Sequence, residues 1–129
     1  EAIKKSWRGT VEDKFPILQQ YKFSICFENC IFNGWITEKI IDSLAAGCVP
    51  VYWGASNITD HIPADCFIDR RQFRDTGEVY NFLNAMTEQE FKGYQQCIAA
   101  FLQSNAAYPF SSEFFAETIV ATIVHDLGR

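Results

Sequence analysis

The sequence of 129 residues lacks the short motifs that most often reveal catalytic chemistry. It contains neither the GxGxxG fingerprint of dinucleotide-binding folds nor the GxxxxGK[ST] loop that cradles phosphates. The HExxH zinc motif and the GxSxG nucleophile elbow are missing as well. No two aspartates stand two residues apart, so there is no DxD metal motif. Any function must therefore be inferred from how polar residues are placed on the predicted fold.

The chain also lacks features of membrane, nucleic-acid and metal proteins. No run of about 18 apolar residues is present, so we expect no transmembrane segment. A net charge of -5 argues against nucleic acid or an anionic membrane as the main partner. The odd set of cysteines has no CxxC pair, and the two histidines stand alone, so no zinc site is expected. We predict reduced, structural thiols at Cys26, Cys30, Cys48, Cys66 and Cys97.

Apolar and aromatic residues are abundant. The chain is 48% hydrophobic, with 12 Phe, 5 Tyr and 3 Trp. A chain of this length should bury roughly 65–70% of its unfolded surface. We therefore expect residues 1–129 to form a single globular domain. Its first residues, EAIKKSWRG, contain no apolar signal segment and suggest part of a longer protein.

The first half of the chain predicts a strand, a helix and a second strand. Residues 21–27, YKFSICF, are rich in aromatic and β-branched types and predict a strand. A loop follows over residues 28–35, with a turn signal at Asn33-Gly34. Residues 48–53, CVPVYW, predict the second strand, although Pro50 lacks an N–H and suggests an edge strand or a bulge.

A helix should connect these two strands. Thr37 is a suitable N-cap, and Gly47 supplies a stop signal. The apolar residues recur at helical spacing, at Ile36, Ile40, Ile41 and Leu44. Two strands joined by a helix form a βαβ unit, whose strands run parallel.

Further elements are predicted on either side of this unit. Residues 11–20 suggest a short helix interrupted by Pro16, and residues 66–68 suggest a third strand. Three helices should follow, begun by Asp75, by a Thr87/Glu90 capping box and by Ser112. We expect their apolar stripes to be core: Val79, Phe82, Leu83 and Met86; Phe91, Tyr94, Ile98 and Phe101; Phe115, Ile119 and Ile123.

The polar residues around the first long helix are the candidate site. Ligands of parallel sheets bind beyond the carboxyl ends of the strands, where the loop over 28–35 and the helix start should lie. The polar residues there are Glu28, Asn29, Thr37, Glu38 and Lys39. A lysine in a first helical turn typically costs about 0.3–1 kcal/mol, because the helix dipole favours anions there.

Two interpretations of these residues remain open from pattern alone. In the first, Lys39 is a solvated surface lysine, Glu38 complements the helix dipole and Asn29 stabilises the turn. Trp35 would then be a staple residue before the cap. In the second, a diphosphate binds at the helix start, Lys39 neutralises it, and Glu38 accepts hydrogen bonds from sugar hydroxyls.

Two segments in order, YKFSICFEN and GWITEKIIDSLAAGCVPVYWG, resemble the α1,3/α1,4-fucosyltransferases of glycosyltransferase family 10. The resemblance extends from about Gly9 to the region of Phe73, roughly half of the chain. It implies an α/β fold with a Rossmann-like parallel sheet flanked by helices, one half of a two-Rossmann-domain glycosyltransferase. The chain would be part of the carboxy-terminal, GDP-fucose-binding half, with the acceptor-side domain outside it.

The family resemblance also implies roles for individual residues. Asn29 and Lys39 match positions at or beside the diphosphate, and Glu38 matches one that faces the ribose and the donor sugar. Thr37 belongs to the same motif. Trp35 stands where the family often has tyrosine. The tryptophan keeps an aromatic face there but lacks the tyrosine hydroxyl. Lys39 and Glu38 would stabilise the donor and leaving group, while the general base would lie in the other domain.

The implied activity is inverting, metal-independent transfer of L-fucose from GDP-fucose to a GlcNAc or glucose hydroxyl of a β-galactoside acceptor. No cofactor is expected. The partners would be GDP-fucose, an oligosaccharide acceptor and an amino-terminal domain of the same protein, whose absence should expose an apolar patch. Bacterial members work at the cytoplasmic face of the inner membrane and eukaryotic members in the Golgi. The alternatives are a non-catalytic nucleotide-sugar-binding or interaction domain, or a transferase for another GDP-sugar.

Overall fold

The centre of the molecule is a parallel sheet of three strands in the order β1-β2-β3. The computed structural model describes residues 7–129 and places β1 at Phe23–Phe27, β2 at Val49–Trp53 and β3 at Ile68–Asp69. Phe23 pairs with Val49 and Phe27 with Trp53, whereas β3 reaches only Val51 and Tyr52. The predicted parallel sheet is confirmed. The third strand begins two residues later than expected, because Ala64–Cys66 forms a 3-10 turn.

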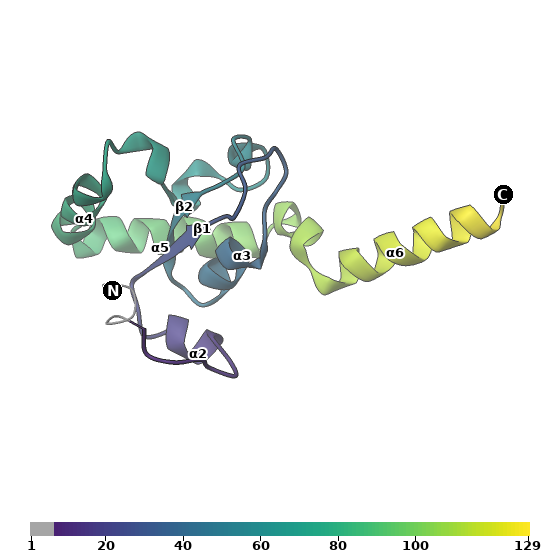
Figure 1. Cartoon of the computed structure of the whole chain (residues 1–129), viewed down its shortest axis with the longest axis horizontal. Helices are drawn as coiled ribbons and strands as arrows, with labels where there is room; N and C mark the ends of the chain where they lie inside the picture. The colour runs from purple at the N-terminus through teal and green to yellow at the C-terminus, as the bar shows by residue number, and fades with distance from the viewer. Residues whose placement is uncertain (1–6) are drawn as a thin grey trace.

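Helices pack against both faces of β1 (Figure 1). Ser24 and Cys26 face α3 (Glu38–Ala45): the hydroxyls of Ser24 and Ser43 hydrogen-bond to each other, and Cys26 Sγ donates to the carbonyl of Lys39 at 3.3 Å. Side chains alternate along a strand, so Phe23 points the other way. Its ring packs edge-to-face on Phe91 of α5 (Glu88–Leu102), with centroids 5.7 Å apart. The sheet is therefore the middle layer of the fold.

The central position of β2 corrects the expectation drawn from Pro50. β2 is not an edge strand, since it pairs with β1 on one side and β3 on the other. The N–H of Val49 donates to Lys22 on the β1 side, so position 50 faces the β3 side. There β3 begins opposite Val51, one residue further on. The missing N–H of Pro50 thus leaves no ladder hydrogen bond unmade.

Most helix boundaries follow the sequence signals. Thr37 caps α3, Asp75 caps α4 (Thr76–Ala85), and Thr87 with Glu90 forms the capping box of α5. Gly47 follows α3 with φ +82°, the left-handed conformation expected after a helix end. The predicted helix over residues 11–20 is only the short α2 (Phe15–Leu18), with the proline in its first turn. The 3-10 segments are Ile58–Asp60, Ala64–Cys66, Arg70–Gln72 and Asn105–Phe110.

The core lies between the sheet and the helices α3, α4 and α5. It is formed mainly by aliphatic and aromatic side chains: Ile40, Leu44, Val49, Val51, Tyr52, Ile58, Ile62, Phe67, Ile68, Val79, Phe91, Ile98 and Phe101. All five cysteines are free thiols, and three of them are buried. Phe82 was expected to be fully internal but is partly exposed, stacking at 5.2 Å on Phe73. No helix within residues 7–129 is long and apolar enough to cross a membrane.

The last helix, α6 (Ser112–Leu127), projects away from the rest of the fold (Figure 1). Ser111, not Ser112, is its N-cap, with its hydroxyl accepting the N–H of Phe114. The expectation that Phe115, Ile119 and Ile123 are core is wrong, since all three are exposed. A helical stripe identifies one face of a helix, but burial also requires an element to pack against it.

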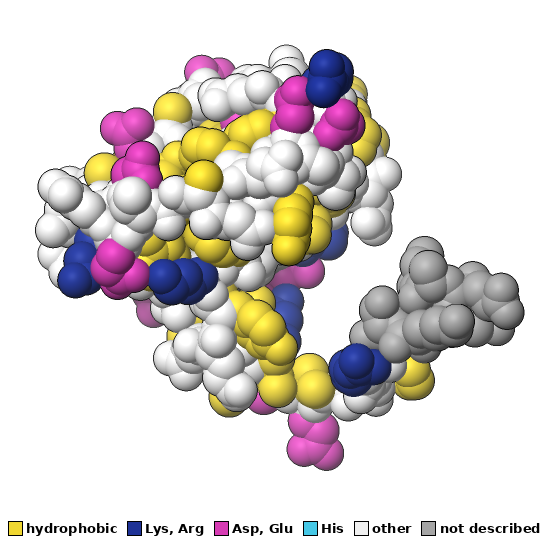
Figure 2. Space-filling model, turned by 90° about the vertical axis from the view of Figure 1, so that its left-hand side faces the viewer, with side chains coloured by type: hydrophobic (Ala, Val, Ile, Leu, Met, Phe, Trp, Pro, Cys, Tyr) yellow, Lys and Arg dark blue, Asp and Glu magenta, His cyan; other side chains and the backbone are white. Residues whose placement is uncertain are grey.

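Large apolar side chains are exposed on other elements too. They include Ile25 on β1 and Ile31, Phe32 and Trp35 in the loop before α3. Figure 2 shows hydrophobic side chains between charged ones on the end of the molecule that carries α4. Exposed apolar residues were expected from the sequence, and that a missing partner domain accounts for them stays a prediction.

We expect hydrogen exchange to distinguish α5 from α6. The amides of α5 should be the better protected, because Phe91, Ile98 and Phe101 anchor that helix in the core while α6 has no buried residue. Amide exchange followed by mass spectrometry measures the difference, with the protection of α6 compared with that of the apolar carboxyl-terminal half of α5. Protection of α6 equal to that of α5 would contradict this, since it would require a surface that covers α6.

Candidate functional site

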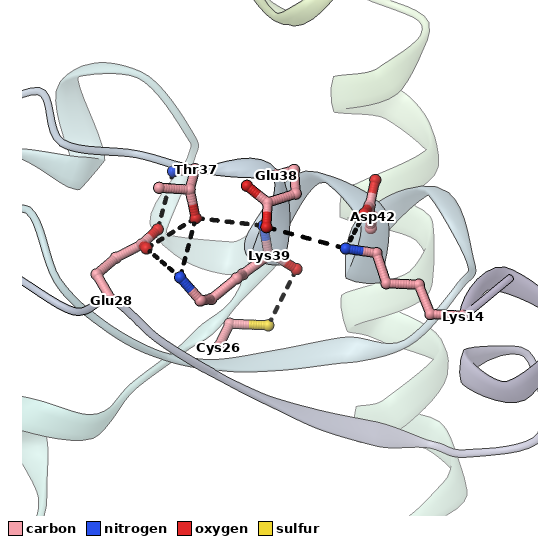
Figure 3. Close-up of polar contacts among 7 residues, drawn as sticks. All are labelled: Lys14, Cys26, Glu28, Thr37, Glu38, Lys39 and Asp42. Carbon is pink, nitrogen blue, oxygen red and sulfur yellow. Dashed lines mark hydrogen bonds and ion pairs between the residues drawn. The ribbon is translucent and has the colours of Figure 1, made fainter. Parts of the chain in front are cut away.

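The candidate site surrounds the loop that joins the carboxyl end of β1 to the start of α3 (Figure 3). In parallel sheets this edge is where ligands bind. Of the polar residues singled out in the sequence, the structure brings Thr37 and Lys39 together around Glu28, the first residue after β1. Glu38, Asn29 and Trp35 are not among the hydrogen-bond partners of its carboxylate within residues 7–129.

The Glu28 carboxylate is the centre of the cluster. Its side chain is 0% exposed. Oε1 accepts the Thr37 N–H at 2.9 Å, and Oε2 accepts the Thr37 hydroxyl at 2.8 Å and the Lys39 ammonium at 3.1 Å. A buried carboxylate requires such partners, because an unpaired charge is costly to remove from water. Glu28 therefore ties the end of β1 to the first turn of α3.

These contacts complete a capping arrangement whose carboxylate comes from outside the helix. In α5 the arrangement is local, since Glu90 accepts both the N–H and the hydroxyl of Thr87 at 2.7 Å. The equivalent position in α3 is Ile40, which has no polar group. Glu28 takes over this role from nine residues before Thr37. The Thr37 hydroxyl in turn accepts the Lys39 N–H at 3.5 Å, which confirms Thr37 as the N-cap.

Lys39 is not a freely solvated surface lysine. Its side chain is 33% exposed, and Nζ lies 3.1 Å from Glu28 Oε2 and 3.4 Å from the Thr37 hydroxyl. The counter-charge that offsets the helix dipole is therefore present within the chain. An ammonium has three N–H donors, and two are directed to these oxygens. The third remains for an acceptor on the exposed side of the helix start.

The hydrogen bonds determine the ionisation of Glu28. Burial acts to raise the pKa of its carboxyl, but the hydrogen bonds from the Thr37 N–H, the Thr37 hydroxyl and the Lys39 ammonium outweigh it. The pKa therefore lies below its ordinary value of 4.5. Glu28 is ionised at neutral pH.

Glu38 points away from the buried carboxylate and is 64% exposed. Its carboxylate lies 4.0 Å from the ammonium of Lys14, which forms a closer pair with Asp42 at 2.6 Å. Figure 3 shows Lys14 approaching α3 from the side opposite Glu28. As the first residue of α3, Glu38 also complements the helix dipole, as one interpretation of the sequence expected.

Asn29 and Trp35 are exposed on the loop between β1 and α3. The Trp35 N–H donates to Phe32 at 3.1 Å, and the preceding Gly34 has φ +76°, which favours glycine. The Gly34 N–H donates to the side-chain oxygen of Asn57 at 2.8 Å. The loop is thereby fastened to the segment after β2, while its Asn29 and Trp35 side chains remain exposed.

Gly54, directly after β2, leaves the space that Glu28 occupies. A Cβ at this position would lie 2.4 Å from the Tyr52 hydroxyl oxygen and 2.5 Å from Cγ of Glu28. The Tyr52 hydroxyl itself accepts the Ala55 N–H at 3.0 Å. The Glu28 side chain thus packs against the turn that follows β2.

A cavity of about 530 Å³ lies elsewhere, between α4, α5 and Asp65. Its lining includes Phe82, Met86, Tyr94 and Cys97, and none of the candidate residues. The candidate residues are therefore not part of this cavity. Among residues 7–129, no three His, Cys, Asp or Glu side chains are grouped so as to hold a metal ion.

From the sequence, Glu28 was recognised only as polar and given no role, and Lys14 and Gly54 were not recognised at all. The signal for Glu28 was the absence of an acidic residue at Ile40, where a capping box would place one. An unfilled capping position suggests a carboxylate from another element. Spacing alone does not say which one.

Together, the fold and site define an α/β domain with a cation at a helix start, at the sheet edge where such domains bind phosphate-bearing ligands. Over residues 2–105 the chain matches the family model described as "Glycosyltransferase family 10 (fucosyltransferase) C-term", and it belongs to that family. The resemblance inferred from the two sequence segments is confirmed.

The relatives include α-(1,3)-fucosyltransferases and GDP-fucose protein O-fucosyltransferases. The chain is 34% identical over 82 residues to an α-(1,3)-fucosyltransferase of Helicobacter pylori, covering 64% of this chain and 17% of the relative. It is 36% identical over 85 residues to a GDP-fucose protein O-fucosyltransferase 3 of Bos taurus, covering 65% and 18%. The chain thus spans about a fifth of the length of these curated relatives.

A solved structure supports the fold directly. A crystal structure of an α1,3-fucosyltransferase with GDP-fucose superposes with a TM-score of 0.61 at 29% identity, covering 66% of this chain and 26% of that one. The predicted Rossmann-like parallel sheet flanked by helices is confirmed. The family match ends before α6, which begins at Ser112.

The first prediction for this site concerns acid stability. The pKa of Glu28 is lower in the folded chain than in the unfolded one, so its stabilisation is present above about pH 4.5 and is lost as pH falls through the folded-state pKa. At pH 7, Glu28→Gln should lower the free energy of unfolding by about 1.5–3 kcal/mol. Urea titrations at pH 3–7 measure the difference between wild type and variant, which should shrink towards pH 3. A difference that is constant with pH would contradict the ionised role.

The second prediction concerns the space beside Glu28. Gly54→Ala should destabilise the chain by about 1–3 kcal/mol, because its methyl group overlaps Tyr52 and Glu28. Gly93→Ala in α5 is the matched control, since a Cβ there meets nothing within 4 Å. It should stabilise the chain by about 0.5–1 kcal/mol through helix propensity. Thermal unfolding measures both changes, and equal signs would refute the packing argument.

Proposed function

We propose that this chain is the GDP-fucose-binding part of a fucosyltransferase and that the donor diphosphate binds at the start of α3. The observation that supports this most is the Lys39 ammonium, fixed at the N-terminus of a helix with one donor to spare. It lies in the region matched to the family model and to a fucosyltransferase crystallised with GDP-fucose.

Transfer of fucose from GDP builds negative charge on the β-phosphate as the glycosidic bond breaks. A cation and helix N–H groups already in place stabilise this charge more in the transition state than in the ground state. We assign the cation to Lys39. Glu38 is assigned to hydroxyls of the ribose or donor sugar, Asn29 to the diphosphate, and Trp35 to an apolar face of the donor.

We propose inversion of the anomeric centre without a metal ion. The acceptor hydroxyl would be deprotonated by a carboxylate of the facing domain, which this chain does not contain. The chain alone should therefore bind donor weakly and transfer no sugar. Cytoplasmic action at the inner membrane fits a bacterial source, and the Golgi fits a eukaryotic one.

The proposed acceptor is a GlcNAc or glucose hydroxyl of a β-galactoside. The relatives include both α-(1,3)-fucosyltransferases and a GDP-fucose protein O-fucosyltransferase. A protein hydroxyl is therefore a second candidate acceptor. Transfer assays of the full-length protein with each acceptor class distinguish the two.

Nucleotide selectivity tests the donor site. GDP should raise the melting temperature of the chain more than UDP or ADP does. Lys39→Ala should weaken GDP binding at least tenfold, because a hydrogen bond to a charged group contributes about 1.5–3 kcal/mol. Glu38→Ala should weaken GDP binding by a smaller factor through loss of a ribose contact.

Lys22→Ala is the matched control, since Lys22 also pairs with a glutamate, Glu88, at 2.9 Å but lies at the opposite end of β1. It should leave GDP binding unchanged. Absence of any GDP shift in wild type would overturn donor binding by this chain. Equal shifts with all three nucleotides would favour a non-catalytic or differently specific nucleotide-binding domain.

A further inference from the structure

The contact between Glu28 and Lys39 is more elaborate than helix capping requires. In α5, Glu90 makes the same two hydrogen bonds to Thr87 from an exposed position and without a lysine. At α3 the carboxylate is 0% exposed, comes from a strand end and holds an ammonium in addition. Burying charges costs free energy that their attraction only partly returns. Stability alone therefore does not account for this arrangement.

The geometry instead restricts the ammonium. A free lysine side chain loses rotamer entropy when it is fixed in one position. Here Nζ is already held by two oxygens, at 3.1 Å from Glu28 and 3.4 Å from Thr37. Both are anchored in turn, because Thr37 is the N-cap of α3 and Glu28 is enclosed by the turn at Gly54.

We propose that Glu28 is a positioning residue for the transfer reaction, holding the Lys39 ammonium where charge develops on the departing phosphate. This inference rests on the proposed function. Glu28 touches neither donor nor acceptor and acts only through Lys39 and Thr37. Its negative charge weakens the attraction of Lys39 for the ground-state diphosphate, so its benefit should appear in the rate and not in the affinity.

The test is steady-state kinetics of the full-length protein with GDP-fucose. Glu28→Gln keeps the shape and a hydrogen-bond acceptor but removes the charge that holds the ammonium. It should lower kcat by about tenfold to a hundredfold, the scale of a misplaced catalytic group. The KM for GDP-fucose should stay within about threefold. In a Lys39→Ala background, the same change should lower kcat no further, because the group that it positions is gone.

Two further variants separate positioning from general destabilisation. Glu90→Gln disturbs the equivalent capping contacts of α5 and should leave kcat and KM unchanged. Glu28→Asp keeps the charge and moves it by one methylene, so it should also lower kcat, and it replaces Glu28→Gln if that variant does not fold. All assays are run well below the melting temperature of each variant, so that the cooperative unfolding transition leaves the protein folded.

The outcomes distinguish the inference from the proposed function. No fucose transfer by the wild-type protein would overturn both. Transfer with an unchanged kcat in the folded Glu28 variant would overturn the positioning role alone. A further loss of kcat when Glu28→Gln is added to Lys39→Ala would also overturn it, since the two effects would then be independent. The positioning role is supported if Glu28→Gln lowers kcat in the wild-type protein, where Lys39 is present, and not in the Lys39→Ala variant.

Discussion

The buried carboxylate of Glu28 is the contact on which the candidate site depends. It joins three parts of the chain: the end of β1, the N-cap of α3 and the Lys39 ammonium. The carboxylate tolerates burial because its partners satisfy it, and the lysine tolerates a helix N-terminus because the carboxylate neutralises it. Each group thus lowers the free-energy cost of the other's position. The start of α3 thereby carries a cation that is held in place by the chain itself.

In the proposed donor site, a small parallel sheet would bind phosphate without a glycine-rich loop. The helix supplies N–H groups, Lys39 supplies charge, and the loop fastened by Asn57 presents exposed aromatic and amide side chains. Membership of glycosyltransferase family 10 gives this surface a chemical context. Apolar residues are also exposed on β1 and α6, outside this cluster.

The local elements were predictable from the sequence because their signals are local. The Thr37 cap and the Thr87/Glu90 capping box appear where the pattern placed them, and the strand predicted over residues 21–27 is present at Phe23–Phe27. Features that depend on distant contacts were not predictable. The apolar stripe of α6 gives no sign that nothing packs against it, and the partner of Lys39 lies eleven residues away on another element. Pro50 was misassigned because the short reach of β3 cannot be read from spacing.

A crystal structure of the full-length protein with GDP tests the central claim most directly. The account predicts that Lys39 Nζ lies within about 3.2 Å of a β-phosphate oxygen, the normal range for a charge-assisted hydrogen bond. The contact between Nζ and Glu28 should persist in the same structure. A diphosphate bound away from the start of α3, or an ammonium that has left Glu28 to reach it, would contradict the account.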